Sequence, residues 1–266
     1  MHNVLDLFSG IGGFSLGLER TGGFTTSAFC EICPEARKVL RKHWADVPIY
    51  EDITKLTAER LHNDGIEIDC ITGGFPCQDI SLAGKGKGIV GERSGLWAEM
   101  FRLIADVRPR WVIAENVSAL RSKGLTLVLQ DLSSLGYHAE WHCIPASAVG
   151  APHQRDRIWI IAYPKSGIFR GGFKTGKYGE LHDTRKRPNE VWRNDSGIRL
   201  PFRKYKMWET EPNMGRVVVR IPRELDKVRR NRIKQLGNSV VPQIPELIGN
   251  AILKKEGKHG CCTGIE

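Results

Sequence analysis

Short apolar runs alternate with amphipathic stretches over the first 163 residues, and this alternation constrains the fold more than any other feature of the sequence. Strands are predicted at residues 4–8, 25–29, 69–72, 110–114, 138–144 and 158–162. Helices are predicted from the first glycine-rich turn to about residue 20, and at residues 34–43, 96–107, 125–135 and 243–255. Strands that alternate with helices along a chain form a mostly parallel sheet with helices on its faces. The sequence therefore predicts an α/β fold with a doubly wound sheet.

The positive charge of the chain is concentrated in one segment. Residues 164–235 contain 20 Lys and Arg against 8 Asp and Glu, a net of +12, whereas the whole chain carries only +10. The segment is rich in glycine, has weak periodicity and interleaves its cations with aromatic residues. A concentrated basic surface with aromatic groups is typical of proteins that bind nucleic acid. A solvated surface region is the alternative interpretation.

The cysteines and the N-terminus indicate the compartment. Seven cysteines form an odd, unevenly spaced set, and no basic signal-peptide start precedes the first apolar run. No apolar run approaches the length of a membrane span. We therefore expect reduced thiols in a cytoplasmic protein that does not enter a membrane. Cys30 and Cys33 have the C-x-x-C spacing of metal ligands but lack a second pair at the distance of a zinc site, so we predict no metal.

A glycine-rich turn follows the first predicted strand in the sequence D-L-F-S-G-I-G-G-F, residues 6–14. Such a turn between a strand and a helix presents backbone N–H groups to a ligand. Glu31 ends the next predicted strand, 21 residues beyond Gly10, where an acidic side chain can accept hydrogen bonds from ribose hydroxyls. Asp52 follows a further segment and could reach an adenine amino group. The pattern indicates a ligand that contains adenosine, and NAD fits it as well as other such ligands do.

A cysteine follows the strand predicted at residues 69–72, in the sequence G-G-F-P-C-Q of residues 73–78. The glycines and Pro76 place this residue, Cys77, on a turn rather than inside the strand. A turn at the end of a strand holds a sulfur at the rim of the sheet, where α/β folds bind their ligands. This position favours a nucleophilic thiol over a buried structural one.

Five segments, in this order, resemble the motifs of the C5-cytosine DNA methyltransferases: D-L-F-S-G-I-G-G-F, G-G-F-P-C-Q, A-E-N-V, H-Q-R-D-R and L-G-N-S-V-V-P. The resemblance covers residues 1–163 and about 233–255. It implies a seven-stranded, Rossmann-like methyltransferase sheet and S-adenosylmethionine as the methyl donor. It also implies a catalytic domain of residues 1–163 plus 233–266, and a small, irregular target-recognition region of residues 164–232 like that of compact members of the family.

The resemblance implies catalytic roles for Cys77, Glu115, Arg157 and Arg155. Cytosine C5 is a poor nucleophile, and a thiolate that adds at C6 makes it enamine-like and able to take a methyl group. Cys77 is the candidate thiolate. Glu115, expected directly after its strand, would hydrogen-bond N3 and the amino group of the base, with Asn116 bracing the turn. Arg157 would face the base and support the thiol, and Arg155 would aid the same site or contact the DNA backbone.

By the same resemblance, the cofactor site combines the glycine-rich turn, the residues around Glu31 and Asp52, the start of the helix at residues 96–107 and the tight G-N-S turn before the last helix. The segment at residues 237–240 is expected to pack beside the first strand and to line the methionine end of the cofactor. The expected cofactor-binding residues are Phe8, Ser9, Gly10, Ile11, Gly12, Gly13, Glu31, Ile32, Asp52, Ile53, Pro76, Leu96, Asn238, Ser239 and Val240.

DNA contacts are expected in two basic segments. The glycine-rich residues after Cys77 match a loop that the family closes over DNA, and such closure needs both mobility and charge. The target-recognition region would contact phosphates and read base edges in the major groove. The expected DNA-binding residues are Gln78, Ser81, Lys85, Lys87, Arg93, Arg203, Lys204, Arg216 and Arg220. The last two are the first candidates for reading bases.

These features together predict an S-adenosylmethionine-dependent DNA (cytosine-5-)-methyltransferase that acts through a covalent bond between Cys77 and C6. The target cytosine must leave the base stack to expose C5 and C6, so base flipping is implied. The expected partner is double-stranded DNA, bound by a monomer, and a cognate restriction endonuclease is a candidate second partner. Two alternatives are an enzyme that acts on RNA cytosine and a catalytically silent DNA-binding relative. The intact Cys77, Glu115 and Arg157 argue against the silent relative.

Overall fold

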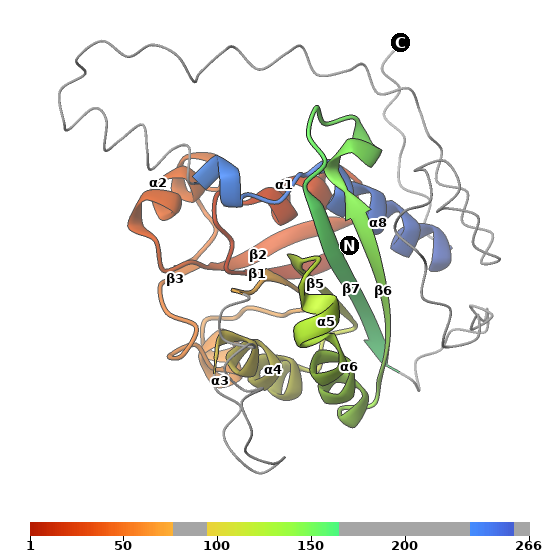
Figure 1. The fold of residues 1–266 in the computed structure, drawn as a ribbon. Helices are drawn as coiled ribbons and strands as arrows, with labels where there is room; N and C mark the ends of the chain where they lie inside the picture. Colours follow the sequence, from red (N-terminus) through yellow and green to blue (C-terminus); the bar gives the residue numbers. More distant parts are fainter. Residues whose placement is uncertain (77–94, 165–234, 258–266) are drawn as a thin grey trace, which may run out of the picture.

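The computed structural model describes residues 1–76, 95–164 and 235–257. Its centre is a seven-stranded sheet in the order β3-β2-β1-β4-β5-β7-β6 (Figure 1). The strands are β1 (His2–Leu7), β2 (Phe24–Cys30), β3 (Ile49–Tyr50), β4 (Cys70–Gly74), β5 (Trp111–Val117), β6 (Tyr137–Pro145) and β7 (Asp156–Pro164). The first five are parallel, whereas β7 runs antiparallel to both β5 and β6. The predicted mostly parallel α/β sheet is confirmed.

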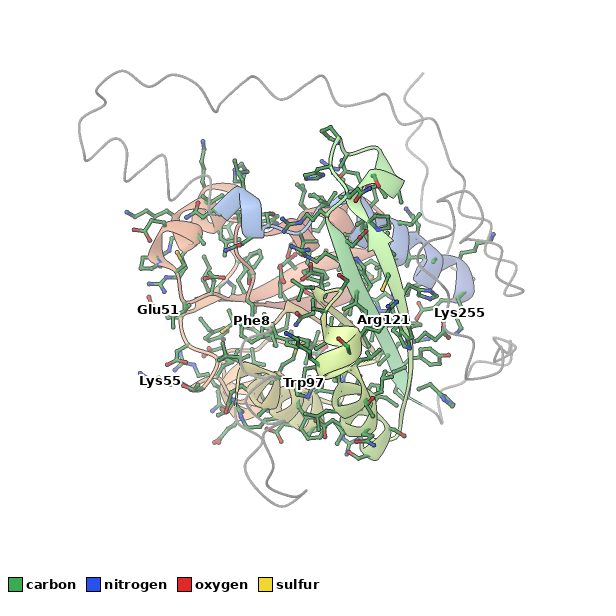
Figure 2. All side chains as sticks on the ribbon, in the orientation of Figure 1. Phe8, Glu51, Lys55, Trp97, Arg121 and Lys255 are labelled. Atoms are coloured by element: carbon green, nitrogen blue, oxygen red, sulfur yellow. The ribbon has the colours of Figure 1, made fainter. Side chains whose placement is uncertain are left out.

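Helices cover both faces of the sheet (Figure 1). They are α1 (Gly13–Glu19), α2 (Pro34–His43), α3 (Ala58–Asn63), α4 (Leu96–Val107), α5 (Leu120–Lys123), α6 (Leu125–Ser134), a 3-10 turn (Ala146–Val149) and α8 (Gln243–Lys255). α1 and α8 pack on one face, where Phe14 and Ile248 belong to one buried apolar cluster. α4 and α6 pack on the other face, where Met100 and Val128 belong to a second cluster. Side chains fill both layers between the sheet and the helices (Figure 2).

The order of the strands reverses between β1 and β4. The chain begins in the middle of the sheet, adds β2 and β3 on one side of β1, and then adds β4 and β5 on the other side. In α/β folds, ligands bind beyond the carboxyl ends of the strands at such a reversal. The glycine-rich turn follows β1 and the segment leading to Cys77 follows β4. Both predicted site segments therefore leave the sheet at this point.

The observed elements follow the predicted ones closely. α2, α4 and α8 have the predicted bounds, and each predicted strand agrees with the observed strand within three residues at either end. β3, α3 and α5 were not predicted, because they are short and α3 buries only Leu61. β5 continues past its predicted end, since its antiparallel pairing with β7 extends to the pair Val117 and Arg157. Glu115 therefore lies inside β5 rather than after it, which corrects the prediction.

The predicted target-recognition region, residues 164–232, falls almost entirely outside the described residues. Its boundary with the catalytic domain stays a prediction. In the described part of the chain, no helix combines the length and the apolar character needed to cross a lipid bilayer.

Glu256, directly after α8, ties the C-terminal helix to the sheet. Its carboxylate accepts hydrogen bonds from His2 Nε2 at 2.8 Å and Trp111 Nε1 at 3.0 Å, and Arg110 Nε lies 2.9 Å away. Although burial disfavours the charged carboxylate, the hydrogen bonds from Trp111 and His2 hold the pKa of Glu256 below its ordinary value. Because His2 starts β1 and Trp111 starts β5, this contact joins α8 to the sheet at the edge opposite the predicted site.

Candidate active site

The glycine-rich turn between β1 and α1 uses backbone conformations that favour glycine. Gly10 and Gly12 have φ values of 54° and 85°, and Phe8 also has a positive φ of 52°. A Cβ at Gly12 would lie 2.7 Å from the ring of Trp44, whereas a Cβ at Gly10 would meet no atom within 4 Å. The turn is therefore closely packed at Gly12 and open at Gly10.

Glu31 directly follows β2 and faces this turn. Its Oε2 accepts a hydrogen bond of 2.7 Å from the Gly10 amide, and its Oε1 accepts one of 2.7 Å from the Cys33 amide. The side chain is thus fixed by one backbone donor on each oxygen. Each carboxylate oxygen has room for a second donor, so Glu31 can still bind hydroxyl groups. The neighbouring Ile32 is 74% exposed.

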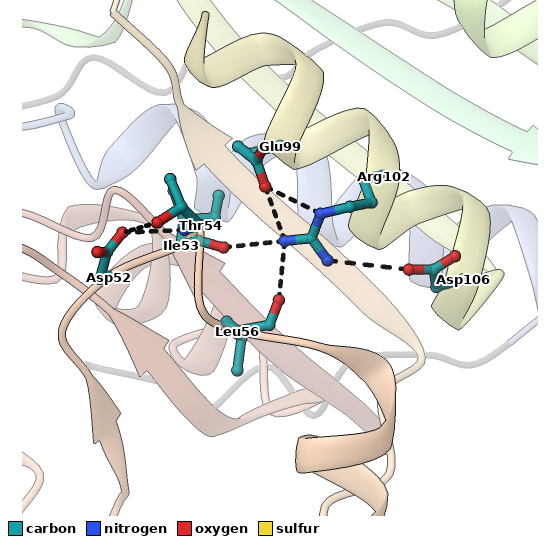
Figure 3. Close-up of polar contacts among 7 residues, drawn as sticks. All are labelled: Asp52, Ile53, Thr54, Leu56, Glu99, Arg102 and Asp106. Carbon is teal, nitrogen blue, oxygen red and sulfur yellow. Dashed lines mark hydrogen bonds and ion pairs between the residues drawn. The ribbon is translucent and has the colours of Figure 1, made fainter.

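Asp52 lies in a turn after β3. Its Oδ1 accepts hydrogen bonds from the Thr54 amide at 3.0 Å and from the Thr54 hydroxyl at 2.7 Å (Figure 3). The hydroxyl bond, followed by the amide bond, lowers the pKa of Asp52. Among the described residues, none donates a hydrogen bond to Oδ2. The side chain of the next residue, Ile53, packs in the core beneath the turn.

Asp6 is a buried carboxyl group that joins three elements of the site. Its Oδ2 accepts a hydrogen bond of 2.9 Å from the Ser15 hydroxyl on α1, and its Oδ1 accepts one of 3.0 Å from the Thr72 hydroxyl on β4. Burial raises the pKa of Asp6 to about 7, although both hydrogen bonds oppose the rise. The sequence motifs did not predict this role of Asp6. The available signal was a charged residue inside the apolar run V-L-D-L-F.

Glu115 and Arg157 form an ion pair toward the carboxyl end of β5. Arg157 Nε lies 2.9 Å from Glu115 Oε1, and the Glu115 side chain is only 12% exposed. Burial raises the pKa of Glu115, and the charges of Arg157 and Arg155 oppose that rise. Antiparallel pairing sets Trp159 opposite Glu115 and Arg157 opposite Val117. The two charged side chains are therefore diagonal neighbours on one face of the sheet.

Gly74 leaves space for this carboxylate. It ends β4 and lies opposite Glu115 in the parallel pairing of β4 with β5. A Cβ at Gly74 would lie 3.2 Å from Glu115 Oε2, a distance at which a neighbouring atom has to shift. A glycine at this position therefore allows Glu115 to sit beside the chain that leads to Cys77.

The segment that leads to Cys77 is fixed to β5 beside that carboxylate. Asn116 Nδ2 donates a hydrogen bond of 2.7 Å to the Phe75 carbonyl, and the Phe75 ring packs on Trp97 with centroids 5.0 Å apart. Asn116 was expected to brace its own turn; it lies within β5 and braces the segment after β4 instead. Pro76 is exposed and is the last described residue before Cys77, which falls outside the described residues.

Arg155 holds the C-terminal segment against the site. Its Nη2 donates a hydrogen bond of 2.9 Å to the Ser239 carbonyl, and its Nη1 donates to the Gly237 carbonyl. The segment lies against α1, where a Cβ at Gly13 would be 2.6 Å from the Val240 carbonyl oxygen. It was expected beside the first strand; Val240 and Val241 pack against the apolar cluster that includes Val4 of β1, and the segment also contacts the start of α1. Arg155 thus binds these carbonyls, whereas Arg157 binds Glu115, and their expected roles toward the base, the thiol and the DNA stay predictions.

A match to a known protein family shows to which family the chain belongs. Residues 2–206 match the C-5 cytosine-specific DNA methylase family. The chain belongs to this family. Its seven-stranded sheet and the order of its motifs are those expected for a C-5 cytosine-specific DNA methylase.

Among similar proteins, the type II methyltransferase M2.BsuMI of Bacillus subtilis strain 168 is 39% identical over 178 aligned residues, and the alignment covers 62% of this chain and 44% of that protein. The type II methyltransferase M.CviJI of Paramecium bursaria Chlorella virus IL3A is 38% identical over 163 residues, 61% of this chain and 43% of that protein. The chain thus aligns with less than half the length of these curated relatives.

Solved structures agree with the family. A putative DNA modification methyltransferase encoded within a prophage of E. coli superposes with a TM-score of 0.51 at 30% identity, covering 62% of this chain and 47% of that one. A mutant of Spodoptera frugiperda DNMT2 superposes with a TM-score of 0.54 at 20% identity, covering 64% of this chain and 52% of that one. The second likeness concerns the fold alone.

The structure brings several of the expected site residues together, and other expected residues lie outside the described ranges. The glycine-rich turn, Glu31 and the Glu115–Arg157 pair lie at the carboxyl edge of the sheet. Leu96 begins α4 and is partly buried against the core. The expected site residues outside the described residues are Cys77, Gln78, Ser81, Lys85, Lys87, Arg93, Arg203, Lys204, Arg216 and Arg220.

Proposed function

We propose that this methylase transfers a methyl group from S-adenosylmethionine to C5 of a cytosine in double-stranded DNA. The observation that carries the proposal is the Glu115–Arg157 ion pair beside the segment that Asn116 anchors and that leads directly to Cys77. The relatives named as type II methyltransferases support the same activity. They also support a place in a restriction–modification system, where a cognate endonuclease would cut unmethylated DNA.

The described residues fit S-adenosylmethionine in three respects. The open side of Gly10 leaves space for a ligand next to the turn. Glu31 accepts from two backbone amides and has lone pairs left for ribose hydroxyls. Asp52 Oδ2, which has no described donor, can accept from the adenine amino group. When bound, S-adenosylmethionine supplies an electrophilic methyl group.

Cys77 acts as the nucleophile in this proposal. Its thiolate would add to C6 of the cytosine and shift the electron pair of the C5–C6 double bond toward C5 and N3, which makes C5 nucleophilic. C5 would then take the methyl group supplied by the bound cofactor, which leaves as S-adenosylhomocysteine when its bond to that group breaks. The C5 proton then leaves to a base and the thiolate is expelled, which restores the double bond. The base must be rotated out of the duplex for a side chain to reach C6. The Asn116 contact fixes the chain two residues before this thiol.

Glu115 assists by binding the edge of the base. Addition at C6 increases the electron density at N3, so a proton donor there stabilises the adduct. Burial raises the pKa of Glu115, which favours the protonated form needed for donation. The charges of Arg157 and Arg155 limit this rise, and Arg157 orients the carboxyl group by direct contact. Because Gly74 has no side chain, Oε2 of Glu115 has space beside the segment that leads to Cys77.

The basic residues between 164 and 232 are proposed to bind the DNA around the target cytosine. Their net positive charge favours contact with phosphates, and a subset reads bases.

The decisive experiment measures transfer of tritiated methyl groups from S-adenosylmethionine to double-stranded DNA and to RNA of the same sequence. Methyl transfer to DNA supports the proposal. Methyl transfer to RNA alone would show that the substrate is RNA rather than DNA. Cys77→Ala should abolish transfer and retain cofactor binding, whereas Cys143→Ala, a partly exposed cysteine on β6, should leave transfer intact. A duplex with 5-fluorocytosine should form a covalent adduct with the wild type only. An adduct that survives Cys77→Ala excludes Cys77 as the nucleophile.

A further inference from the structure

Arg102 on α4 binds the turn that carries Asp52 (Figure 3). Its Nη2 donates a hydrogen bond of 2.9 Å to the Ile53 carbonyl and one of 2.8 Å to the Leu56 carbonyl. These partners lie 49 and 46 residues away in the sequence, so the contact joins two distant parts of the chain. No motif in the sequence indicates it. The turn that carries Asp52, the proposed adenine contact, is thus held by α4. In the sequence, α4 follows the segment that contains Cys77.

The guanidinium is itself held in place by two carboxylates on the same helix. Arg102 Nε donates to Glu99 Oε2 at 2.9 Å, and Nη1 lies 3.9 Å from Asp106 Oδ2. The Arg102 side chain is 32% exposed, so solvent screens these ion pairs only in part. With donors engaged on three sides, the planar group has one orientation relative to the turn.

The bond to Ile53 reaches Asp52 through a single peptide group. The Ile53 carbonyl accepts from Arg102, and the N–H of the same peptide, which belongs to Thr54, donates to Asp52 Oδ1 at 3.0 Å. The peptide group is planar and trans, so its C=O and N–H point in opposite directions. When Arg102 fixes the carbonyl, it therefore also fixes the direction of the N–H that holds the carboxylate. The positive charge of Arg102 beside the Ile53 carbonyl also polarises this peptide group, which makes the Thr54 N–H a stronger hydrogen-bond donor.

We propose that Arg102 is a positioning residue that orients the Asp52 carboxylate, through the Ile53–Thr54 peptide, toward the adenine amino group of the cofactor. The inference rests on the proposed function, in which Asp52 accepts a hydrogen bond from that group. Arg102 acts through Asp52 and takes no part in methyl transfer. It thereby sets how strongly the site selects an amino group over other substituents at this position of the purine.

A purely structural role for Arg102 leads to a different expectation. If the residue only fastened the turn to α4, its loss would weaken every ligand of the pocket to the same degree. If it orients Asp52, its loss weakens ligands that offer an amino group to Asp52 and leaves ligands without that group unaffected. The comparison of two such ligands therefore separates the two roles.

The binding experiment uses calorimetry with S-adenosylhomocysteine and its deaminated analogue, S-inosylhomocysteine, which presents an oxygen in place of the amino group. Arg102→Lys keeps the positive charge but loses the planar set of guanidinium N–H donors, and Arg102→Gln loses the charge as well as these donors. Both variants should bind S-adenosylhomocysteine about tenfold more weakly, the scale of one hydrogen bond to a charged group. Their affinity for the deaminated analogue and their kcat at saturating cofactor should be unchanged. Equal loss for both ligands overturns the inference.

The matched control is Arg60 on α3. It is an exposed arginine that pairs with Asp64 at 2.7 Å, as Arg102 pairs with acidic neighbours, but it makes no bond to the turn of Asp52. Arg60→Lys and Arg60→Gln should bind both ligands as the wild type does. A loss in these variants equal to that of the Arg102 variants would show that any arginine near this loop has the effect, which also overturns the inference.

A second measurement needs no cofactor. The Thr54 amide donates to Asp52 Oδ1, so its NMR shift in the wild type should follow the ionisation of Asp52 as pH is varied. In Arg102→Lys, which keeps the positive charge, the pH-dependent change in the Thr54 amide shift should be smaller, because the amide no longer points at Asp52. A change equal to that of the wild type overturns the inference, regardless of the results on cofactor binding. A wild type that binds neither ligand overturns the proposed function and the role at adenine, while the Thr54 response still decides whether Arg102 orients Asp52.

Discussion

The side-chain amide of Asn116 lies 2.7 Å from the carbonyl oxygen of Phe75 and donates a hydrogen bond to it. Asn116 is the neighbour of Glu115 in β5, and Phe75 precedes Cys77 by two residues. One contact between β5 and the chain after β4 therefore controls the spacing between the proposed acid and the proposed nucleophile. Catalytic groups that must act on one ring depend on such spacing.

Asn116→Asp should lower kcat strongly. The substitution keeps the shape of the side chain but replaces the donor by a carboxylate, which repels the Phe75 carbonyl. A displacement of the thiol by about 1 Å reduces the rate on the order of 100-fold, and the affinity for S-adenosylhomocysteine should not change. Steady-state kinetics and calorimetry measure the two quantities. Asn63→Asp, an exposed change of the same kind at the end of α3, is the control. A normal kcat in Asn116→Asp would contradict the proposed spacing.

Glu31→Ala should weaken binding of the cofactor. Hydrogen bonds to a charged group contribute about 1.5–3 kcal/mol each, and the variant loses those from the ribose hydroxyls. Calorimetry with S-adenosylhomocysteine measures the loss, and Glu59→Ala on the exposed side of α3 is the matched control. An affinity equal to that of the wild type would place the ribose contact on another residue.

The Asp6 carboxyl group should make the stability of the protein depend on pH near neutrality. Burial raises its pKa from 3.8 to about 7, so the folded protein binds this proton more tightly than the unfolded chain does. The contribution of the group is fully present below the unfolded pKa and is lost as pH rises through about 7. The free energy of unfolding of the wild type relative to Asp6→Asn should therefore fall between about pH 5 and about pH 8.

Urea unfolding at the two pH values measures this difference. Asp46→Asn, at an exposed position, corrects for the general effect of removing a carboxylate. A difference between the wild type and Asp6→Asn that is the same at both pH values would show that Asp6 does not titrate in this range.

DNA affinity should decrease steeply with salt if the residues between 164 and 232 bind phosphates. The logarithm of the binding constant should fall with the logarithm of salt concentration with a slope of about −0.9 for each phosphate neutralised. Replacing Arg203 and Lys204 by Gln should reduce the slope and weaken binding on all sequences alike. An affinity that stays constant between about 50 and 200 mM salt would leave the positive charge as an ordinary solvated surface.

The sequence was sufficient where local pattern determines structure. The apolar periodicity of α4 and the proline that begins α2 located these helices at their observed bounds. The sequence was insufficient where a partner strand sets the end of a strand, or where a side chain from a distant segment holds a turn. β5 is extended by its pairing with β7, which moved Glu115 into the strand. The bonds from Arg102 to the turn of Asp52 depend on tertiary packing between segments far apart in the chain, which periodicity does not report.

The segment rich in Lys and Arg begins in the sequence at one end of β7, and the residues that follow that segment are held at the other end of β7. Pro164 ends the strand in register with Tyr137, and Arg155 at its start holds the carbonyls of Gly237 and Ser239. β7 has nine residues, so its two ends lie roughly 27 Å apart at about 3.4 Å for each of the eight steps between them. Any segment that bridges this distance can be joined to the same two anchors. If residues 164–232 recognise DNA as proposed, exchange of this segment would change the recognised sequence while Glu115, Arg157 and the glycine-rich turn stay the same.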